Sequence, residues 1–499
     1  MKKLVYTISI VLLAWSTFAQ DLTDALRYSN YHISGTARST AMGNAFGALG
    51  GDFSSLSINP AGAAVYRSSE FTFTTLVGNT KTEGDYLGNK TNVSEYNISI
   101  NNIGYVASIP TGASSETGLV SLSFGMGFNR LGSFTGSMLA EGANSSSSLL
   151  KYFTYNVNNP YTLPENMNSY YERLAYDTYL LNYDNQNKEY FNDITDNGYG
   201  QSFRKTTQRE GHINEYLLSF AANFNHKFYI GGTFGIHDVY FREDANLYEF
   251  DAKNNIPYFN DFNFNTSLTT SGYGFNFKMG AIYKPTTNLR LGFAFHTPTF
   301  YNLNDYYYNT MNSSITYPAD GMTENYKANP DKGGVYDYKI DTPFKFIVSG
   351  AYLIGKSGLI SVDYEIVDYS TIKISHGSDG YSFYDENAEI SKAYKTTGNL
   401  HIGGEYRVDK NFSLRAGYEN YGDAFNSSYL NERNQKTNKP YSTISGGLGY
   451  KQGNFFIDAT YQRVMDQQNI KLYPDINANE MVQYTTGQNN LIFTLGYKF

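Results

Sequence analysis

Seven histidines and a set of charged residues on alternating segments are the side chains of this chain that could do chemistry. No two histidines share a helical or strand spacing that would form a metal site. The nearest approach to a catalytic group is His401 with Glu405 or Arg407 on one strand face. The same face of neighbouring segments carries five further charges, Asp363, Glu365, Arg415, Glu419 and Asp458. Opposite charges that face one another inside a protein usually form a structural ion-pair network, and we favour that interpretation.

The familiar catalytic and cofactor motifs are missing from the sequence. There is no G-x-S-x-G elbow, no P-loop, no H-E-x-x-H and no EF-hand spacing. The chain has no cysteine, which excludes disulfides and thiolate metal sites. We therefore predict that the protein is not an enzyme and uses no cofactor. A catalytic dyad assembled from separate strands is the alternative, since enzymes built on barrels exist.

The first 19 residues are predicted to be a cleaved signal peptide. Lys2 and Lys3 precede an apolar run over residues 4–15, and Thr17, Phe18 and Ala19 form a small-x-small cleavage site. The apolar run is shorter than the roughly 18 residues expected of a membrane-spanning helix. The mature chain is then expected to begin at Gln20, and with no cysteine it cannot be a lipoprotein.

Composition narrows the class of protein further. Net charge is −8, and removal of the two N-terminal lysines makes it −10, so nucleic acid is not an expected partner. Tyrosine (48) and phenylalanine (34) are abundant, yet mean hydropathy is only −0.45. Segments of about ten alternating residues with aromatic ends, and no long apolar helix, are typical of a transmembrane β-barrel.

The last segment shows the alternation most clearly. One face carries Leu491, Phe493, Leu495, Tyr497 and Phe499, and the other is mainly polar. A soluble β-sandwich would also alternate, because successive side chains of any strand point to opposite faces. The connections decide between the two, since short turns and long polar loops follow one another as in outer-membrane barrels. Phe499, inside a strand at the end of the chain, is the predicted assembly signal for the barrel assembly machinery.

These features predict an all-β transmembrane barrel over residues 67–499, with about fourteen antiparallel strands. Fourteen is an even number, as expected of a single-chain bacterial barrel. The strands are expected to begin near Phe71, Tyr96, Leu119, Tyr216, Phe228, Thr269, Leu289, Phe344, Leu359, Leu400, Phe412, Tyr441, Phe455 and Asn490.

A different texture precedes the barrel, in a segment rich in small residues. Residues 20–66 are predicted to form a small helical plug in the lumen, with a short helix up to Tyr28 and another over residues 36–49. Asn59 and Pro60 mark a tight turn, Ala61 follows, and Gly62 permits a close backbone approach. An ordinary cap packed under a soluble domain is the alternative for this segment alone.

The run Ser57-x-Asn59-Pro60-Ala61-Gly62, with Ala41-Met42-Gly43-Asn44 upstream, resembles the FadL/TodX family of outer-membrane long-chain fatty-acid and hydrocarbon transporters. The resemblance implies capture of the substrate at extracellular loops, transfer to the plug, and exit sideways through the barrel wall. It places the gap in the wall at a kink of the third strand, where Gly125 and Gly127 are the candidates for a lateral gate. Packing against the plug is the other reading of these glycines. We expect the substrate near four plug residues: Met42, Phe46, Leu49 and Phe53.

Residues 132–213 are the largest predicted loop. Residues 164–181 could form an amphipathic helix, with Met167, Tyr171 and Leu174 on one stripe as a landing face for an apolar ligand. The alternative, which we favour slightly, is a loop that packs its own small core.

The sequence thus predicts a passive outer-membrane channel of a Gram-negative bacterium, in contact with membrane lipids. Its substrates are expected to be hydrophobic molecules such as long-chain fatty acids. Two rival functions stay open: a general or structural barrel, and a surface receptor, for example for haem. Haem ligation would need an exposed side chain such as His212 or a tyrosine between Tyr152 and Tyr190.

Overall fold

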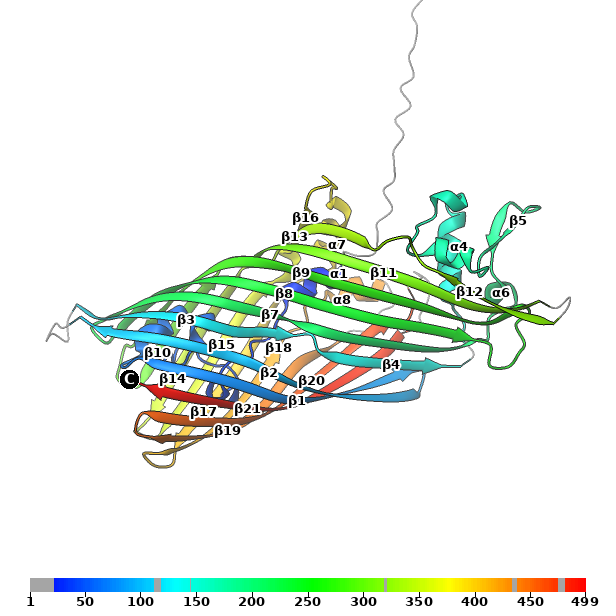
Figure 1. Cartoon of the computed structure of the whole chain (residues 1–499). Helices are drawn as coiled ribbons and strands as arrows, with labels where there is room; N and C mark the ends of the chain where they lie inside the picture. Colours follow the sequence, from blue (N-terminus) through cyan, green and yellow to red (C-terminus); the bar gives the residue numbers. More distant parts are fainter. Residues whose placement is uncertain (1–21, 112–117, 144, 318–320, 433–437, 474–480) are drawn as a thin grey trace, which may run out of the picture.

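The structure is a computed structural model of the chain (Figure 1), and it describes residues 22–111, 118–143, 145–317, 321–432, 438–473 and 481–499. The predicted signal peptide lies outside these described residues. Among them, no helix combines the length and the apolar character needed to cross a membrane.

One antiparallel sheet closes on itself (Figure 1). The first strand, β1 (Glu70–Tyr86), pairs with β2 (Asn89–Pro110) on one side and with the last strand, β21 (Met481–Lys498), on the other. Across that closing ladder Phe71 lies opposite Tyr497. Counted over the described residues, the wall has fourteen strands, some of them interrupted by a bend or a loop. The predicted barrel fold is therefore confirmed.

The remaining wall strands follow in chain order. The uninterrupted ones are β7 (Ser202–Phe224), β8 (Phe228–Phe250), β9 (Phe259–Tyr283), β17 (Thr396–Arg407), β18 (Phe412–Tyr421), β19 (Lys439–Gln452) and β20 (Phe455–Lys471). The interrupted ones are β3 (Leu119–Ser133) with β4 (Gly136–Gly142), β10 (Leu289–His296) with β11 (Phe300–Tyr317), β12 (Met322–Ala328) with β13 (Gly334–Asp341) and β14 (Lys345–Ile354), and β15 (Gly358–Asp368) with β16 (Lys373–His376).

The apolar face of these strands points outward, as the barrel prediction requires. On β21, Leu491 and Leu495 are about half exposed, whereas Thr494 between them is fully buried inside. An exposed apolar face suits lipid, and an inner face of threonine, asparagine and charged residues suits a polar lumen.

Predicted strand starts agree with the structure at the short-turn end and come late at the loop end. β2, β7, β9 and β21 begin 7 to 14 residues before the predicted positions. These strands start outside the membrane, where outward side chains need not be apolar. The alternation of apolar and polar residues is lost there, although the hydrogen-bonded ladder continues.

Residues 22–66 lie inside the barrel (Figure 1). They form α1 (Leu22–Ser29), α2 (Ala37–Ala41), α3 (Ser55–Ile58) and the 3₁₀ helix η1 (Pro60–Val65). α2 contacts the β18–β21 side of the wall, and η1 contacts β3, β7, β8 and β9 on the opposite side. The segment therefore spans the lumen from one wall to the other.

The predicted helix over residues 36–49 is wrong beyond α2. Gly43 and Asn44 follow with φ of 58° and 53°, which ends the helix. The backbone of Gly43 lies against the backbones of Ile402 and Tyr418, so a Cβ would not fit there. Close contact with the wall, and not local propensity, decides the conformation of this stretch.

Between β4 and β7, residues 143–201 form a small subdomain at the loop end of the barrel (Figure 1). Its elements are α4 (Leu149–Asn158), η2 (Pro164–Asn166), α5 (Glu172–Asp177), β5 (Asn182–Asp184), β6 (Glu189–Phe191) and α6 (Asp193–Asp196). The single helix predicted over residues 164–181 is wrong. Only η2 and α5 form in that range, because Tyr179 takes a φ of 58° and the hydroxyl of Thr178 bonds back to the carbonyl of Leu174.

Further helices from the loops cover the upper lumen: η3 (Tyr369–Thr371), α7 (Tyr384–Ala393) and α8 (Ser427–Glu432). Together with α1 they enclose an apolar cluster in which Ala25 and Tyr28 pack among wall residues that include Phe241 and Tyr338. We call this cluster the upper apolar core.

Candidate functional site

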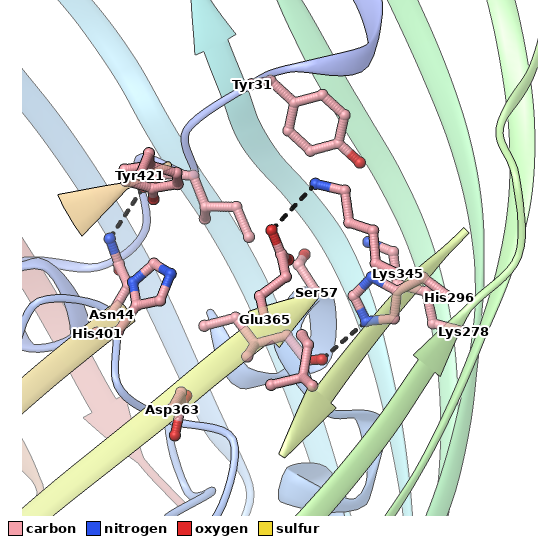
Figure 2. Close-up of a pocket in the computed structure, with 13 residues that line it drawn as sticks. Tyr31, Asn44, Ser57, Lys278, His296, Lys345, Asp363, Glu365, His401 and Tyr421 are labelled. Carbon is pink, nitrogen blue, oxygen red and sulfur yellow. Dashed lines mark hydrogen bonds and ion pairs between the residues drawn. The ribbon is translucent and has the colours of Figure 1, made fainter. Parts of the chain in front are cut away.

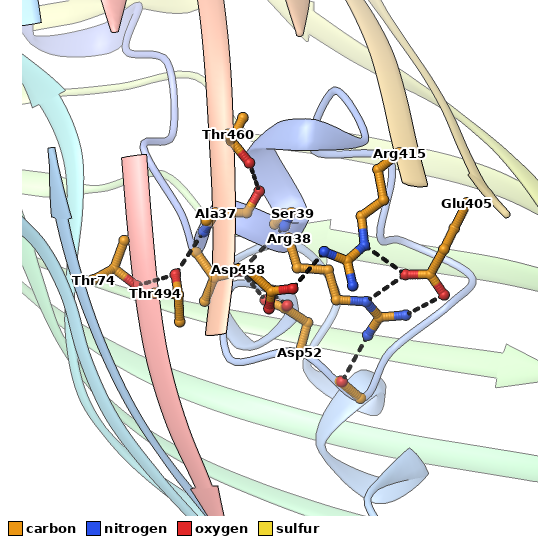
Figure 3. A network of polar contacts seen from close by, with 12 residues as sticks. Ala37, Arg38, Ser39, Asp52, Thr74, Glu405, Arg415, Asp458, Thr460 and Thr494 are labelled. Carbon is orange, nitrogen blue, oxygen red and sulfur yellow. Dashed lines mark hydrogen bonds and ion pairs between the residues drawn. The ribbon is translucent and has the colours of Figure 1, made fainter. Parts of the chain in front are cut away.

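The lower plug is fastened to the wall by a charged network around Arg38 (Figure 3). The Arg38 guanidinium donates to Glu405 of β17, with Nε and Oε2 2.9 Å apart, and to the carbonyl of Gly51. Glu405 also accepts from Arg415 at 2.7 Å, and Arg415 pairs with Asp458 of β20. The backbone of Ala37 adds bonds to Thr460 and Thr494.

The opposite side of the plug is fastened through Ser57. Its hydroxyl donates to Glu215 of β7, and it accepts from the side-chain amide of Asn129 of β3 at 2.7 Å. Glu215 forms an ion pair with Lys278 of β9, and neither side chain is more than 2% exposed. A continuous chain of polar contacts thus runs from β3 through the plug to a buried ion pair.

Above these contacts lies a polar cavity between plug and wall (Figure 2). Lys345 points toward Glu365, with their charged atoms 3.7 Å apart, and the ring of Tyr31 lies 4.4 Å from the Lys345 ammonium. Asp363 accepts from the backbone N–H of Gly47, while its second oxygen has no hydrogen-bond partner. The free volume is about 40 Å³ for the centres of water-sized spheres, which holds about three waters and no alkyl chain.

The barrel wall is open beside this region. The β2–β3 ladder begins at Pro110 and ends at Asn102, opposite Asn129. Residues 89–101 of β2 continue upward paired with β1 alone, while β3 and β4 stay paired with β7. The two edges meet again only through side chains, such as Ser137 with Glu95 at 2.8 Å. We call the interval between residues 96–101 and 130–136 the wall break.

A bulge lies at the lower corner of the wall break. Thr74 pairs with Asn102 and Thr75 with Ile100, so Asn101 is an extra residue in β2. A bulge bends its strand and disturbs the ladder locally. Ile98 above it points outward and is 79% exposed. From inside, the backbone N–H of Ser34 donates to the carbonyl of Arg130, so the plug segment lies directly behind the wall break.

Comparison with known families now settles the class of protein. Residues 187–499 match the model of the outer membrane protein transport protein family (OMPP1/FadL/TodX). The chain belongs to this family. It is therefore an outer-membrane transporter of hydrophobic molecules and not an enzyme, and its place is the outer membrane of a Gram-negative bacterium. Among curated protein sequences, none matches the chain.

Solved structures share the fold of this FadL/TodX member. A Pseudomonas aeruginosa FadL homologue gives a TM-score of 0.55 at 13% identity, covering 94% of this chain and 99% of that one. The P. putida toluene transporter TodX gives 0.51 at 14% identity, covering 93% and 98%. The Ralstonia pickettii toluene transporter TbuX gives 0.50 at 13%, with the same coverage.

The motif that carried the resemblance forms the contact between plug and wall. Asn59 caps η1 by accepting from the N–H of Ala61 at 3.1 Å, and its amide donates to the carbonyls of Gly47 and Ala281. Pro60 opens η1, the position where its missing N–H costs least. The closest approach of Gly62 is to the Gly50 backbone and to Ser55, which leaves no space for a Cβ.

The structure does not place the expected substrate residues of the plug around the cavity. Met42, Phe46 and Leu49 are buried against wall residues such as Ala294 and Ile347. Phe53 lies in a separate cluster under β2, β7 and β9. All four are at most 3% exposed.

The expected loop residues pack within their own subdomain. Leu174 and Tyr171 belong to the core under α4 and α5, and Met167 packs with Val157 and Tyr190. This arrangement corresponds to the alternative of a loop with its own small core.

Gly125 and Gly127 lie below the wall break, where β3 is hydrogen-bonded on both sides. A Cβ on Gly125 would meet Leu56, and one on Gly127 would meet the carbonyl of Ile103 and the ring of Phe53. Both glycines allow the wall to approach the plug closely, and the open part of the wall begins two residues beyond Gly127.

The candidate catalytic group is likewise tied to the plug. His401 accepts or donates at the carbonyl of Gly43, 3.0 Å away, and lies 3.7 Å from Glu419. Glu405, Arg415 and Asp458 belong to the Arg38 network, which is the structural role that the sequence favoured.

The candidate haem ligands are not brought together either. His212 pairs with Asp238 on the β7–β8 wall. Tyr161, Tyr183 and Tyr190 stack on one another in the loop subdomain. In the part of the chain that the structure describes, no three His, Asp or Glu side chains are grouped to hold a metal ion.

Sequence reasoning missed the residues at the edge of the wall break. Asn101, Asn102 and Asn129 are completely buried inside β2 and β3. A signal was present, because Ile100, Asn101, Asn102 and Ile103 break the strict alternation of β2 with one residue too many. Such a skip in the period of two is the sequence mark of a bulge.

Proposed function

We propose that the protein carries amphiphilic molecules such as long-chain fatty acids and releases them sideways through the wall break into the membrane. The observation that carries the proposal is the end of the β2–β3 ladder at Asn102 and Asn129, with the plug segment directly behind it. An edge strand inside a closed barrel leaves backbone groups unpaired, so its presence calls for a reason.

The height of the wall break in the membrane supports sideways exit. On β1 the outward apolar residues end at Val77, which pairs with Ile98 of β2. On β7 they end at Tyr216, which pairs with Phe128 just below Asn129. The wall break therefore lies at the loop-side edge of the apolar band, level with the outer leaflet. Exit there keeps an alkyl chain out of water, which is worth roughly 0.8 kcal/mol for each methylene.

The loop subdomain supplies a surface on which an apolar molecule could first bind. Tyr155, Tyr161, Leu163 and Tyr179 expose about half of their surface or more at the loop end of the barrel. Exposed aromatic and aliphatic side chains grouped in this way favour contact with apolar ligands.

The cavity in Figure 2 favours a substrate with a charged head. Its lining contains Lys345, whose ion pair with Glu365 is loose at 3.7 Å, so the ammonium can bind a second carboxylate. The upper apolar core adjoins it through Tyr31 and Ile33 and offers the surface for a chain. Toluene, the molecule named for TodX and TbuX, has no group that this cavity would recognise.

Deletion of Asn101 tests the proposal. Since Asn101 is the extra residue of the bulge, its removal preserves the inward position of Asn102 and the outward position of Ile100. β2 should straighten, extend its ladder with β3 and close the wall break. Uptake of labelled oleate by cells that rely on this protein should fall about tenfold or more, while the protein stays heat-modifiable.

Asn101→Ala is the matched control, since it keeps the bulge and removes only the side chain; oleate uptake should stay near the wild-type level. Toluene uptake is measured in parallel. Normal oleate uptake after the deletion would refute sideways exit. A wild-type protein that carries toluene and not oleate would refute the substrate, and one that carries neither would favour the structural barrel or the receptor.

A further inference from the structure

A second and larger cavity lies at the opposite end of the plug. It is bounded by the underside of α2 and by the inner faces of β1 and β17–β21, at the end of the barrel that carries the short turns. Its free volume is about 290 Å³ in the measure used above, enough for a small organic molecule. Short turns mark the periplasmic side of an outer-membrane barrel, so we call it the periplasmic vestibule.

The periplasmic vestibule is positively charged, although the chain as a whole is negative. Its lining contains six basic residues and four acidic ones. The acidic side chains are all engaged: Glu405 and Asp458 in the Arg38 network, Glu70 with Lys498 at 2.9 Å, and Asp52 with the hydroxyl of Thr36 at 2.8 Å. Little acceptor capacity is left for the other cations.

Arg407, Lys410 and Lys451 are those other cations. They come from the end of β17, from the turn that follows it, and from the end of β19, and they meet at one side of the periplasmic vestibule. Across the described residues, none of the three forms an ion pair. Three uncompensated cations around a concave surface attract anions, because low-dielectric walls focus their field.

We propose that the periplasmic vestibule binds a small water-soluble oxyanion, a phosphate- or carboxylate-bearing solute of the periplasm. The guanidinium of Arg407 supplies paired donors for such a group, and the two lysines supply point charges. A lipid head group would have to enter through the wall, which is closed here: Arg407 pairs with Ser413, Phe412 with Tyr450, and Glu70 with Lys498. The opening toward the periplasm is the remaining way in.

Binding at this site is separate from transport of the hydrophobic substrate. The periplasmic vestibule lies below the Arg38 network, and the cavity of Figure 2 and the wall break lie above it. Because Arg38 belongs to the plug and the three free cations to the wall, a bound anion would bridge plug and wall. It would therefore hold the plug more firmly in place.

Calorimetric titration of the purified mature barrel with inorganic phosphate at low ionic strength tests the proposal. Saturable binding with one site per barrel is expected, and glycerol, an uncharged probe, should give none. The triple variant Arg407→Gln, Lys410→Gln, Lys451→Gln should bind phosphate at least about tenfold more weakly, because the uncompensated charges are gone. The folded state should be kept, since no described ion pair is removed.

Lys227→Gln with Lys356→Gln is the matched control. These exposed lysines lie in the turns after β7 and β14, at the same end of the barrel but outside the periplasmic vestibule. The double variant should bind phosphate like the wild type. The proposal is overturned if the wild type binds no phosphate, or if the triple variant binds as well as the double variant.

Discussion

Replacement of Lys278 by methionine should reveal how strongly the buried ion pair holds plug and wall together. The Lys278 ammonium lies 2.5 Å from Glu215, with 2% and 0% of the two side chains exposed. Methionine keeps most of the volume of the lysine stem but leaves the Glu215 carboxylate with only Ser57 and His237 beside it. The variant thus removes a charge and little packing.

The expected cost follows from that burial. Breaking a buried pair by removing one partner costs about 3–5 kcal/mol, because the remaining charge is left uncompensated. At about 1.4 kcal/mol for each factor of ten, the ratio of folded to unfolded protein should fall by roughly a hundredfold to a few thousandfold. The pair Arg173 and Asp177, at 2.7 Å but more than a third exposed on both sides, is the contrast. Arg173→Met there should cost no more than about 0.5 kcal/mol.

Urea unfolding in lipid vesicles, followed by far-ultraviolet circular dichroism, measures both variants. The double variant Lys278→Met, Glu215→Gln should recover most of the lost stability, since no charge is then left buried without a partner. A Lys278→Met barrel that unfolds at nearly the same urea concentration as Arg173→Met would refute this reasoning. So would a double variant that is as unstable as the single one.

Three further predictions concern other parts of the chain. Gly127→Val should prevent normal assembly, because Gly127 has a φ of 156° and a Cβ would lie 2.2 Å from the carbonyl of Ile103; Gly350→Ala, with open space around it, should assemble normally, and electrophoretic heat modifiability distinguishes the two. Burial in the loop subdomain raises the pKa of Asp193 to about 6, with Asp196 adding to the effect, so folding there binds a proton between about pH 4 and 6 and stability falls as the pH rises through that range. Asp193→Asn should therefore protect the amides of residues 192–199 from hydrogen exchange better than the wild type at pH 8, by about 1 kcal/mol at most because the group is partly solvated, and equally at pH 3.5; equal protection at both values would contradict the shift. Phe499→Asp should lower the amount of barrel at the cell surface far more than it lowers stability, since the Phe499 ring is 66% exposed and contacts only Tyr105 and Tyr497 among the described aromatic rings; unchanged surface levels would exclude its role as the assembly signal.

The sequence by itself determined the membrane barrel. Strict alternation, as in residues 491–499, needs only a surface that is apolar outside and polar inside, and it is written residue by residue. The strand ends at short turns are also local, because Gly, Asn and Asp mark them. Where β7 and β9 rise out of the membrane the outward side chains become polar, and the local signal of these strands disappears.

The conformation of the plug was decided by the tertiary structure. The stretch from Thr36 to Leu49 has the spacing of a helix, yet Gly43 lies so close to β17 and β18 that the chain must turn. The Asn59 motif was visible in the sequence, but its role as the contact with Ala281 of β9 depends on a residue more than two hundred positions away.

The location of the site also depends on such distant pairings. Met42, Phe46 and Leu49 were expected beside the substrate because they are apolar and share a helical spacing, but the close fit of the plug buries them against the wall. The wall break arises because a single extra residue, Asn101, bends β2 away from β3. A bulge changes the ladder only where two strands meet, so the sequence of one strand shows the extra residue but not the opening beside it.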